Sequence, residues 1–348
     1  MSVEPHRRLL PSSTGLSARL AVAALRERNI DPAPLLKRAG LPEDVVSEQA
    51  PRLSAEALAR FLELAADEVG DSAFGLGLAE NANPRVAGLL FYIASAASTV
   101  GEGLALVARY LRIVNEAFRL QIAHSSEGVV AEVVLVGLSR HRMRQTCEFA
   151  VAGLVRLLRE AAGRKLRLAR VAFSHARNAE LKDFERFFGC PVEFGAAADV
   201  LVFSEETLGV SLMTEDRYLL DVLRPICEEA AAQRGTSAAS LRATVENQAQ
   251  KLLPLGKARR EIVAKALGVS PRTLSRRLSE EGTTYEHVID DLRRSLALQY
   301  VREPSVSVSQ IAWLLGYEGP TSFNHAFRRW TGASPSSARS QRLLVPPP

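Results

Sequence analysis

The chain has 348 residues, which is more than one ordinary hydrophobic core accommodates and predicts two or three domains. Its 47% hydrophobic residues, 24% charged residues and net charge of +5 are ordinary for a soluble globular protein. The longest uncharged apolar run, residues 86–100, is shorter than the roughly 20 residues of a bilayer helix, and the first residues lack an apolar stretch of signal-peptide length. We therefore expect a cytoplasmic protein without a membrane partner.

The first part of the chain is predicted to be helical after a short flexible tail, which we place at residues 1–15. Alanine- and leucine-rich stretches from residue 16 to about residue 82 have helical spacing, and Ser54 precedes one of them as an N-cap. Residues 101–115 repeat the amphipathic helical pattern.

From residue 117 the pattern changes. Residues 117–124 alternate in polarity and residues 129–136 are rich in β-branched side chains, which together predict a strand hairpin. The elements predicted next are a helix at 142–162, a strand at 168–174, a helix at 179–188 and strands at 191–194 and 200–203. Because helices and strands are mixed, we predict an α+β sensor or regulatory domain over residues 16–212.

Residues 213–240 are predicted to form a helical junction and linker. Helical spacing covers residues 215–234, and the segment 235–237 (Gly-Thr-Ser) is the best linker candidate. From residue 238 onward only helices and turns are predicted. We therefore expect an all-α domain over residues 241–342 and a short tail at residues 343–348.

The three cysteines, Cys147, Cys190 and Cys227, lie far apart, whereas a metal site needs ligand pairs two to four residues apart. We interpret them as reduced, buried thiols, with a redox sensor as the alternative.

The all-α segment contains an internal repeat. Residues 262–268 resemble residues 310–316, with an offset of 48 that brings Ala264 onto Ala312. The offset becomes 49 further on, where Leu274 matches Phe323, so the second copy has one extra residue in its turn. Two copies at matched spacing are much more specific than one.

Each copy has the spacing of a helix-turn-helix unit. In the first copy, Ala264 is small where two helices approach, and Gly268 ends the first helix in a conformation that other residues resist. Ser270 and Pro271 are favoured at the N-cap and first position of the second helix, while Leu274 fills the angle between the helices. The second copy adds a predicted capping box at Ser307 and Gln310.

Between the copies, residues 285–302 read as a single helix after a predicted capping box at Thr283 and Glu286. A helix of this length spans about 27 Å. It suits a strut that holds two recognition helices roughly one duplex turn, about 34 Å, apart.

The positive charge of the chain is concentrated in this segment. Residues 245–348 hold 15 Lys and Arg against 9 Asp and Glu, whereas the rest of the chain holds 29 against 30. A segregated basic domain is typical of a module that binds phosphates, so we predict double-stranded DNA as the partner.

Residues from about 241 to 339 resemble the DNA-binding domain of the AraC/XylS family of transcription regulators. The family's closing signature is carried by Gly316-Tyr317, Ser322-Phe323-Asn324, Phe327-Arg328-Arg329-Trp330, Gly332, Ser334-Pro335 and Arg339. The resemblance implies two helix-turn-helix units, at about 261–282 and 308–331, joined by a linker helix. It also implies that the first recognition helix reads bases and that the second reads bases or mainly contacts the backbone.

Carried over by position, the DNA contacts expected in the first unit are Arg272, Ser275, Arg276 and Arg277. Arg276 is expected to read a guanine edge, since its planar fork matches the two guanine acceptors. Arg277 is expected to face a phosphate or a neighbouring carboxylate, Glu280 or Glu281.

In the second unit the expected contacts are Thr321, Ser322, His325, Arg328 and Arg329. His325 stands where several relatives have arginine, which leaves base reading by this unit open. Arg328 and Arg329 are expected to contact phosphates. The six large apolar side chains of the two units are expected in the core: Leu274, Leu278, Trp313, Phe323, Phe327 and Trp330.

Residues of about 16–212 resemble the amino-terminal module named for arabinose binding in part of the same family. The likeness is carried by residues 171–175 and 187–194 (Val-Ala-Phe-Ser-His and Phe-Phe-Gly-Cys-Pro-Val-Glu-Phe). It implies an effector-sensing or dimerising role, with the effector unknown. Weak candidates for effector contacts are Arg140, His141 and His175, because a basic cluster suits an anionic ligand.

The leading hypothesis is a sequence-specific transcription factor that regulates promoters in response to a small-molecule effector. We expect RNA polymerase and a second copy of the chain as further partners. The alternatives are a DNA-binding protein fused to an enzymatic or DNA-repair module and a sequence-indifferent architectural binder. Repair modules of this kind carry a Pro-Cys-His reactive site, whereas Cys190-Pro191 has the reverse order. The sequence has no phosphate-cradling glycine loop, nucleophile elbow or metal pair, so we expect no enzyme activity, cofactor or metal.

Overall fold

The computed structural model describes residues 11–46, 52–177, 181–234, 240–303 and 306–340. Backbone contacts divide the chain into two compact units, one built mainly from residues before 240 and the other mainly from residues after it. The second unit also takes in two short segments of the earlier chain, Ser139–His141 and His175–Ala179. The predicted linker at residues 235–237 and the tail at residues 343–348 lie outside the described residues.

The first unit is an α+β domain with ten α-helices among the residues that the structure describes. They are α1 (Leu16–Glu27), α2 (Ala33–Ala39), α3 (Ala55–Val69), α4 (Phe74–Asn81), α5 (Leu89–Ser95), α6 (Val100–Tyr110), α7 (Arg144–Ala162), α8 (Leu181–Phe188), α9 (Glu205–Leu208) and α10 (Arg217–Ala232). The predicted cap of α3 is confirmed, because the Ser54 hydroxyl accepts a hydrogen bond from the backbone N–H of Ala57.

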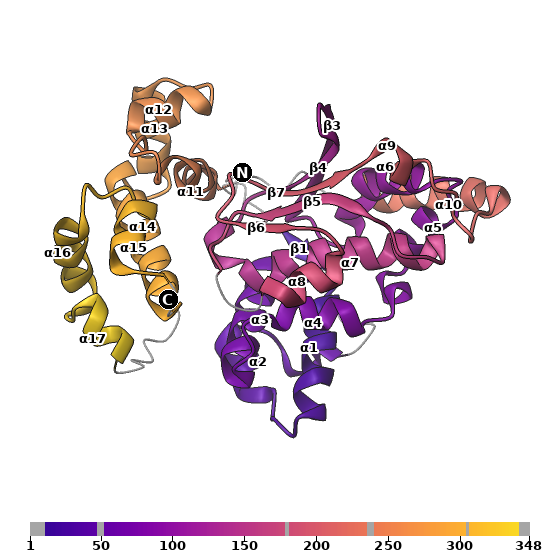
Figure 1. The fold of residues 1–348 in the computed structure, drawn as a ribbon, viewed down its shortest axis with the longest axis horizontal. Helices are drawn as coiled ribbons and strands as arrows, with labels where there is room; N and C mark the ends of the chain where they lie inside the picture. Colours follow the sequence, from indigo (N-terminus) through magenta and orange to yellow (C-terminus); the bar gives the residue numbers. More distant parts are fainter. Residues whose placement is uncertain (1–10, 47–51, 178–180, 235–239, 304–305, 341–348) are drawn as a thin grey trace, which may run out of the picture. The chain divides into compact units, whose positions relative to one another are not determined.

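The sheet of this unit has five strands in the order β3-β4-β7-β5-β6 (Figure 1). The strands are β3 (Phe118–Ser125), β4 (Gly128–Leu135), β5 (Leu168–Phe173), β6 (Val192–Phe194) and β7 (Asp199–Phe203). The predicted hairpin is confirmed as the antiparallel pair β3 and β4, in which Phe118 faces Leu135. Among the described strand pairs of this sheet, only β5 and β6 run parallel, and α8 lies between them in the chain.

One hydrophobic cluster joins this sheet to the helices beside it. It contains the fully buried Val171 and Phe173 of β5, Leu201 of β7 and Val151 and Leu158 of α7. A second cluster holds α1, α2 and α3 together. A two-stranded ribbon, β1 (Ser12–Ser13) with β2 (Leu53–Ser54), ties in part of the segment that we expected to be a flexible tail.

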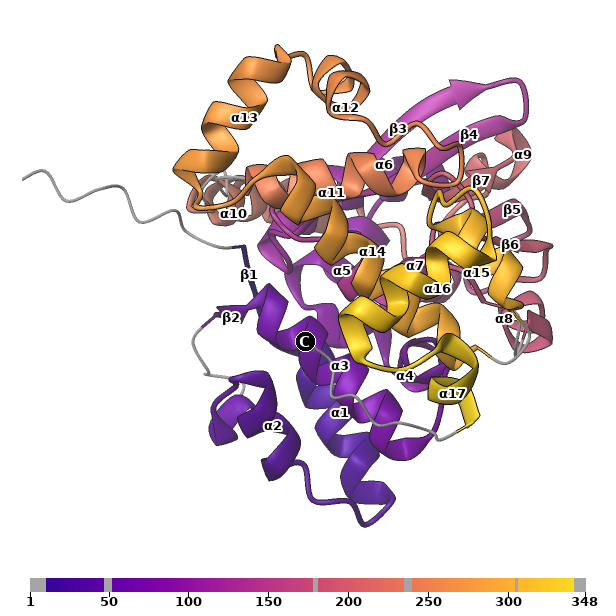
Figure 2. The same cartoon turned by 90° about the vertical axis from the view of Figure 1, so that its left-hand side faces the viewer.

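The second unit is helical throughout its described residues. Its helices are α11 (Leu241–Leu252), α12 (Arg260–Ala266), α13 (Pro271–Glu280), α14 (Tyr285–Arg302), α15 (Val308–Leu314), α16 (Pro320–Thr331) and α17 (Pro335–Ser340). The predicted repeat is visible in these bounds: α15 begins and ends 48 residues after α12, and α16 begins 49 residues after α13. Figure 2 shows α12 and α13 at one end of this unit and α16 and α17 at the other.

Two local predictions for this unit are wrong. The N-cap of α14 is Thr284, whose hydroxyl accepts from the N–H of His287, and not Thr283 as predicted. Trp313 is 60% exposed instead of buried, because it occupies the outer face of α15, at the position that the exposed Lys265 has in the first copy. The remaining apolar residues of the repeat are buried as predicted, apart from the half-buried Trp330.

Among the described residues, no helix combines the length and the apolar character that crossing a membrane requires.

Gly268 and Gly316, the matched glycines of the repeat, both have a positive φ, of 68° and 72°. A Cβ at Gly268 would meet open space, whereas a Cβ at Gly316 would overlap the backbone carbonyl of Leu253 at the end of α11. Replacing either glycine by alanine therefore brings left-handed strain of about 1 kcal/mol, and Gly316→Ala adds a backbone clash.

We expect Gly316→Ala to lower the free energy of unfolding of the second unit by at least about 1 kcal/mol more than Gly268→Ala does. Both tryptophans of the chain, Trp313 and Trp330, lie in this unit, so urea unfolding of the full chain followed by tryptophan fluorescence measures it selectively. Equal losses of unfolding free energy in the two variants would contradict the close approach of α11 to the turn between α15 and α16.

Candidate nucleic-acid interface

The first helix-turn-helix unit consists of α12 and α13. Leu274 and Leu278 of α13 are fully buried, which turns the opposite face of the helix outward. Arg272, Arg276 and Arg277 are exposed and Ser275 is half-buried. As predicted, Pro271 opens α13, and the Ser270 hydroxyl caps it by accepting from the N–H of Thr273 at 3.1 Å.

The three exposed arginines differ in their surroundings. Arg276 forms an ion pair with Glu280, one helical turn later, at 2.5 Å. Arg272 and Arg277 form no ion pair with the described residues. The carboxylates expected beside Arg277 are engaged elsewhere: Glu280 by Arg276, and Glu281 by the start of α11.

The second unit of the repeat consists of α15 and α16. Its predicted capping box is confirmed: the Ser307 hydroxyl accepts from the N–H of Gln310 at 3.2 Å, and the Gln310 side chain accepts from the N–H of Ser307 at 2.8 Å. In α16 the buried residues are Phe323, Ala326 and Phe327. The five predicted contacts lie away from this buried face and are all exposed: Thr321, Ser322, His325, Arg328 and Arg329.

Arg329 is tied to the linker helix α14. Its guanidinium forms an ion pair with one carboxylate oxygen of Asp290 at 2.5 Å, and the indole N–H of Trp330 donates to the other oxygen at 2.9 Å. Arg328 forms no ion pair with the described residues. Of the two expected phosphate contacts, Arg328 is therefore the one whose charge is unneutralised by a neighbouring side chain.

Two further arginines fix the second helix-turn-helix unit on α14. Arg293 donates from Nε to the carbonyl of Leu315 at 3.0 Å and lies over the ring of Tyr317, 4.9 Å from its centre. Arg339 of the closing signature donates to the carbonyls of Val301 and Val306 at 3.2 Å and 2.7 Å, at and beyond the end of α14. Sequence reasoning did not assign these structural roles to Arg293 and Arg339, nor that of Asp290.

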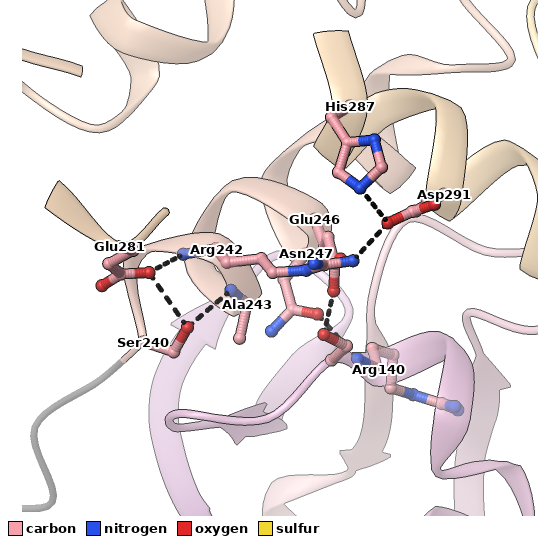
Figure 3. Close-up of polar contacts among 10 residues, drawn as sticks. Arg140, Ser240, Arg242, Ala243, Glu246, Asn247, Glu281, His287 and Asp291 are labelled. Carbon is pink, nitrogen blue, oxygen red and sulfur yellow. Dashed lines mark hydrogen bonds and ion pairs between the residues drawn. The ribbon is translucent and has the colours of Figure 1, made fainter. Parts of the chain in front are cut away.

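The first helix-turn-helix unit is anchored by the start of α11 (Figure 3). The Glu281 carboxylate, which follows α13, accepts from the N–H groups of the first two residues of α11 at 3.1 Å each. Arg242 of α11 reaches Asp291 of α14 at 2.8 Å, and His287 lies 3.3 Å from the same carboxylate. These contacts hold the end of α13, α11 and the start of α14 in one arrangement.

The three effector candidates, Arg140, His141 and His175, belong to this second compact unit and are all buried. Arg140 Nη2 and His175 Nδ1 lie 2.9 Å apart, so the structure brings these two together. The backbone N–H of Arg140 donates to the side-chain carbonyl of Asn247 on α11 at 2.7 Å (Figure 3). An effector that binds Arg140 or His175 would therefore have to compete with these contacts.

The thiols have the properties of structural cysteines. Burial raises the pKa of the Cys190 thiol to about 11, against the nearby Arg159 guanidinium, which lowers it. Burial also raises the pKa of Cys227, and Cys147 is buried. Since the thiolate is the reactive form, the raised pKa values disfavour the half-buried Cys190 and the buried Cys227 as redox sensors. Within the described ranges, no three His, Cys, Asp or Glu side chains are grouped as metal ligands.

The geometry therefore offers outward guanidinium, hydroxyl and imidazole groups on two matched helices, which suits base edges and phosphates. Comparison with known families agrees with a DNA-binding role for these helices. Residues 30–212 match the model described as the arabinose-binding domain of AraC transcription regulator, N-terminal, and residues 263–341 match a helix-turn-helix domain. The chain belongs to the AraC family of transcription regulators. The family and the fold class expected from the sequence are thereby confirmed.

The proteins to which this AraC-family chain is similar are also named as regulators. It is 30% identical to the HTH-type transcriptional regulator VirS of Mycobacterium tuberculosis over 91% of this chain and 93% of that protein. It is 28% identical to the ornithine utilization regulator of Pseudomonas aeruginosa over 78% of this chain and 79% of that protein. The crystal structure of the transcriptional regulator CdpR from Pseudomonas aeruginosa aligns over 98% of this chain and 100% of that one, with 23% identity and a TM-score of 0.47.

The Arg276–Glu280 pair yields a prediction for this AraC-family regulator. Glu280→Gln releases Arg276 and is expected to tighten binding to an operator duplex about twofold to fivefold, in line with the weak energy of exposed ion pairs. In an Arg276→Ala background the same change is expected to give a smaller gain, since only the general loss of a negative charge remains.

Fluorescence anisotropy with the four proteins of this double-mutant cycle measures the coupling. An equal gain in both backgrounds would show that Glu280 acts on DNA directly and not through Arg276.

Proposed function

We propose that this AraC-family regulator reads promoter DNA mainly through α13 and holds the duplex through α16. The observation that carries the proposal is the outward face of α13, where three arginines surround Ser275 and only one of them has a carboxylate partner. Guanidinium groups on a recognition helix are suited to guanine in the major groove, where a bidentate pair discriminates by about 1–3 kcal/mol.

The helix α16 is assigned a different role. Its outward side chains are two hydroxyls, one imidazole and two arginines, and the Ser322 hydroxyl donates to the carbonyl of Gly319 at 2.9 Å. That bond occupies a group otherwise available to a base. We therefore assign Arg328 and Arg329 to phosphates and leave Thr321 and His325 as the residues that contact bases if this helix reads sequence.

The amino-terminal module is proposed to sense a small-molecule effector and to change promoter affinity. Arg140, His141 and His175 remain proposals as effector contacts. We further propose that the regulator acts in the cytoplasm, contacts RNA polymerase at its promoters and associates with a second copy of itself.

Arg276→Ala is expected to cost about 1–3 kcal/mol on the operator and to relax specificity at one base position. Arg328→Ala is expected to weaken binding to all sequences alike and to reduce the salt slope by about one charge. Genome-wide footprinting identifies the operator, and anisotropy titrations on operator and scrambled duplexes at several salt concentrations then separate the two effects. If both variants lose affinity equally on both duplexes, the chain is a sequence-indifferent binder.

Effector sensing requires reciprocal coupling, since an effector that changes DNA affinity must have its own affinity changed by DNA equally. We expect at least one metabolite related to the footprinted genes to change operator affinity by about fivefold or more, the lower end of typical allosteric coupling. Titrations of the full chain with operator DNA, with and without each metabolite, measure this. Unchanged affinity across a broad panel would reduce the amino-terminal module to a scaffold.

A further inference from the structure

Two short segments of the amino-terminal module belong to the second compact unit. Ser139–His141 follows strand β4, and residues 175–177 follow strand β5. Both strands pair antiparallel with β7, so they run parallel to each other and their carboxyl ends lie at the same end of the sheet. Ser139 comes four positions after the last residue of β4, and His175 two positions after that of β5. Connections this short leave little slack, so a displacement of that end of the sheet would move both segments.

The two segments are tied to each other and to the helices α11 and α14. Arg140 Nη2 lies 2.9 Å from His175 Nδ1, and the backbone N–H of Arg140 donates to Asn247 of α11 at 2.7 Å (Figure 3). The side-chain amide of Gln299, on α14, donates to the carbonyl of His141 at 2.5 Å. The segments are therefore part of the scaffold on which the helix-turn-helix units are built.

The carboxylate of Glu246, on α11, is the central contact of this scaffold. Glu246 is 1% exposed. One of its oxygens accepts from the Ser139 hydroxyl, and the other accepts from Nε of Arg242 at 2.9 Å. A buried carboxylate that loses a donor has to replace it. If Ser139 moved away, the Arg242 guanidinium, already bound to one oxygen, would have further N–H groups to offer to the other.

Arg242 leads from Glu246 to the recognition helix α13. Its Nη2 donates to Asp291 of α14 at 2.8 Å, and its backbone N–H donates to the Glu281 carboxylate at 3.1 Å (Figure 3). Glu281 directly follows α13 and also accepts from the N–H of Leu241 at 3.1 Å. A guanidinium that turned wholly to Glu246 would release Asp291. It would also shift the residue whose N–H group holds the end of α13.

We propose that Glu246 is a positioning residue that couples the segment Ser139–His141 to the recognition helix α13. While Ser139 and Arg242 share its carboxylate, the start of α11 holds the end of α13 in place. A displacement at the end of the sheet removes the Ser139 hydroxyl and weakens that hold. This inference rests on the proposed effector sensing and names the route by which it reaches DNA. Because coupling is reciprocal, DNA bound at α13 must also act on the segment.

Hydrogen–deuterium exchange of the full chain, without DNA, tests the route because backbone N–H groups lie at its far end. Those of Leu241 and Arg242 report on the bonds to Glu281. Ser139→Ala is expected to speed their exchange about fivefold or more, the lower end of typical coupling between sites. Ser139→Thr keeps the hydroxyl and is expected to exchange like the wild type. Unchanged exchange at Leu241 and Arg242 in Ser139→Ala would overturn the proposal.

Gln299→Ala is the matched control, since it cuts another contact of the same segment without touching Glu246. It is expected to speed exchange at Arg140, whose N–H reports on the segment itself, and to leave Leu241 and Arg242 as in the wild type. If Gln299→Ala speeds exchange at the start of α11 as much as Ser139→Ala does, the effect is a general loosening of the segment and the route through Glu246 is wrong.

The operator duplex identified by footprinting tests the reciprocal direction. DNA is expected to slow exchange at Arg140 about fivefold or more in the wild type. Glu246→Gln is expected to abolish this slowing while the duplex still protects α13. A purely structural Glu246 predicts a change in the exchange of the free variant and the same slowing by DNA. Slowing at Arg140 that persists in Glu246→Gln would therefore overturn the proposal.

The exchange measurements without DNA separate this inference from the proposed function. If metabolites change operator affinity while Ser139→Ala leaves exchange at the start of α11 unchanged, effector sensing stands and the Glu246 route is refuted. If exchange responds to Ser139→Ala but operator affinity responds to no metabolite, the route stands and effector sensing is refuted.

Discussion

The DNA-binding unit depends on one helix, α14, against which the second helix-turn-helix unit packs directly and the first packs through α11. Its 18 residues give a span of about 27 Å, and its buried residues extend along it from Tyr285 to Val301. The apolar contacts alone would permit the helices packed on α14 to slide along it. Polar contacts at defined points prevent this sliding. Near the first helix-turn-helix unit, Arg242 of α11 reaches Asp291 of α14. In the second, Arg329 ties α16 to α14, and Arg293 ties the turn before α16 to α14.

The two halves of the repeat are alike in backbone and different in electrostatics. In the first, the carboxylate that neutralises an arginine lies on the same helix, so the pair opens without disturbing the packing. In the second, the carboxylate is Asp290 of α14, which also holds the indole of Trp330. Arg329 is therefore part of the scaffold as well as of the outer surface, and this difference suits one half for reading sequence and the other for holding the duplex.

Much of the fold was predictable because its signals are local. Ser54, Ser270 and Ser307 cap helices where their spacing indicated, and the bounds of α12 and α15 differ by the 48-residue offset that the repeat predicted. The cap of α14 was displaced by one residue, since two threonines stand side by side. The contacts of Asp290 and Arg293 were not predictable, because they join residues 39 and 22 positions apart, beyond any local spacing rule. Trp313 was wrongly predicted to be buried, because an apolar residue at helical spacing does not show whether another part of the chain packs over it.

The short pair between Arg276 and Glu280 has a consequence for how the protein searches a chromosome. If Arg276 reads a guanine, as proposed, its guanidinium would keep the Glu280 carboxylate on random sequence, and sliding contacts would depend on the remaining cations. A guanine in register would offer two acceptors that compensate for opening the pair. An intrahelical carboxylate would then lower affinity most for the wrong sites, which would widen the gap between a target and the many sites that compete with it.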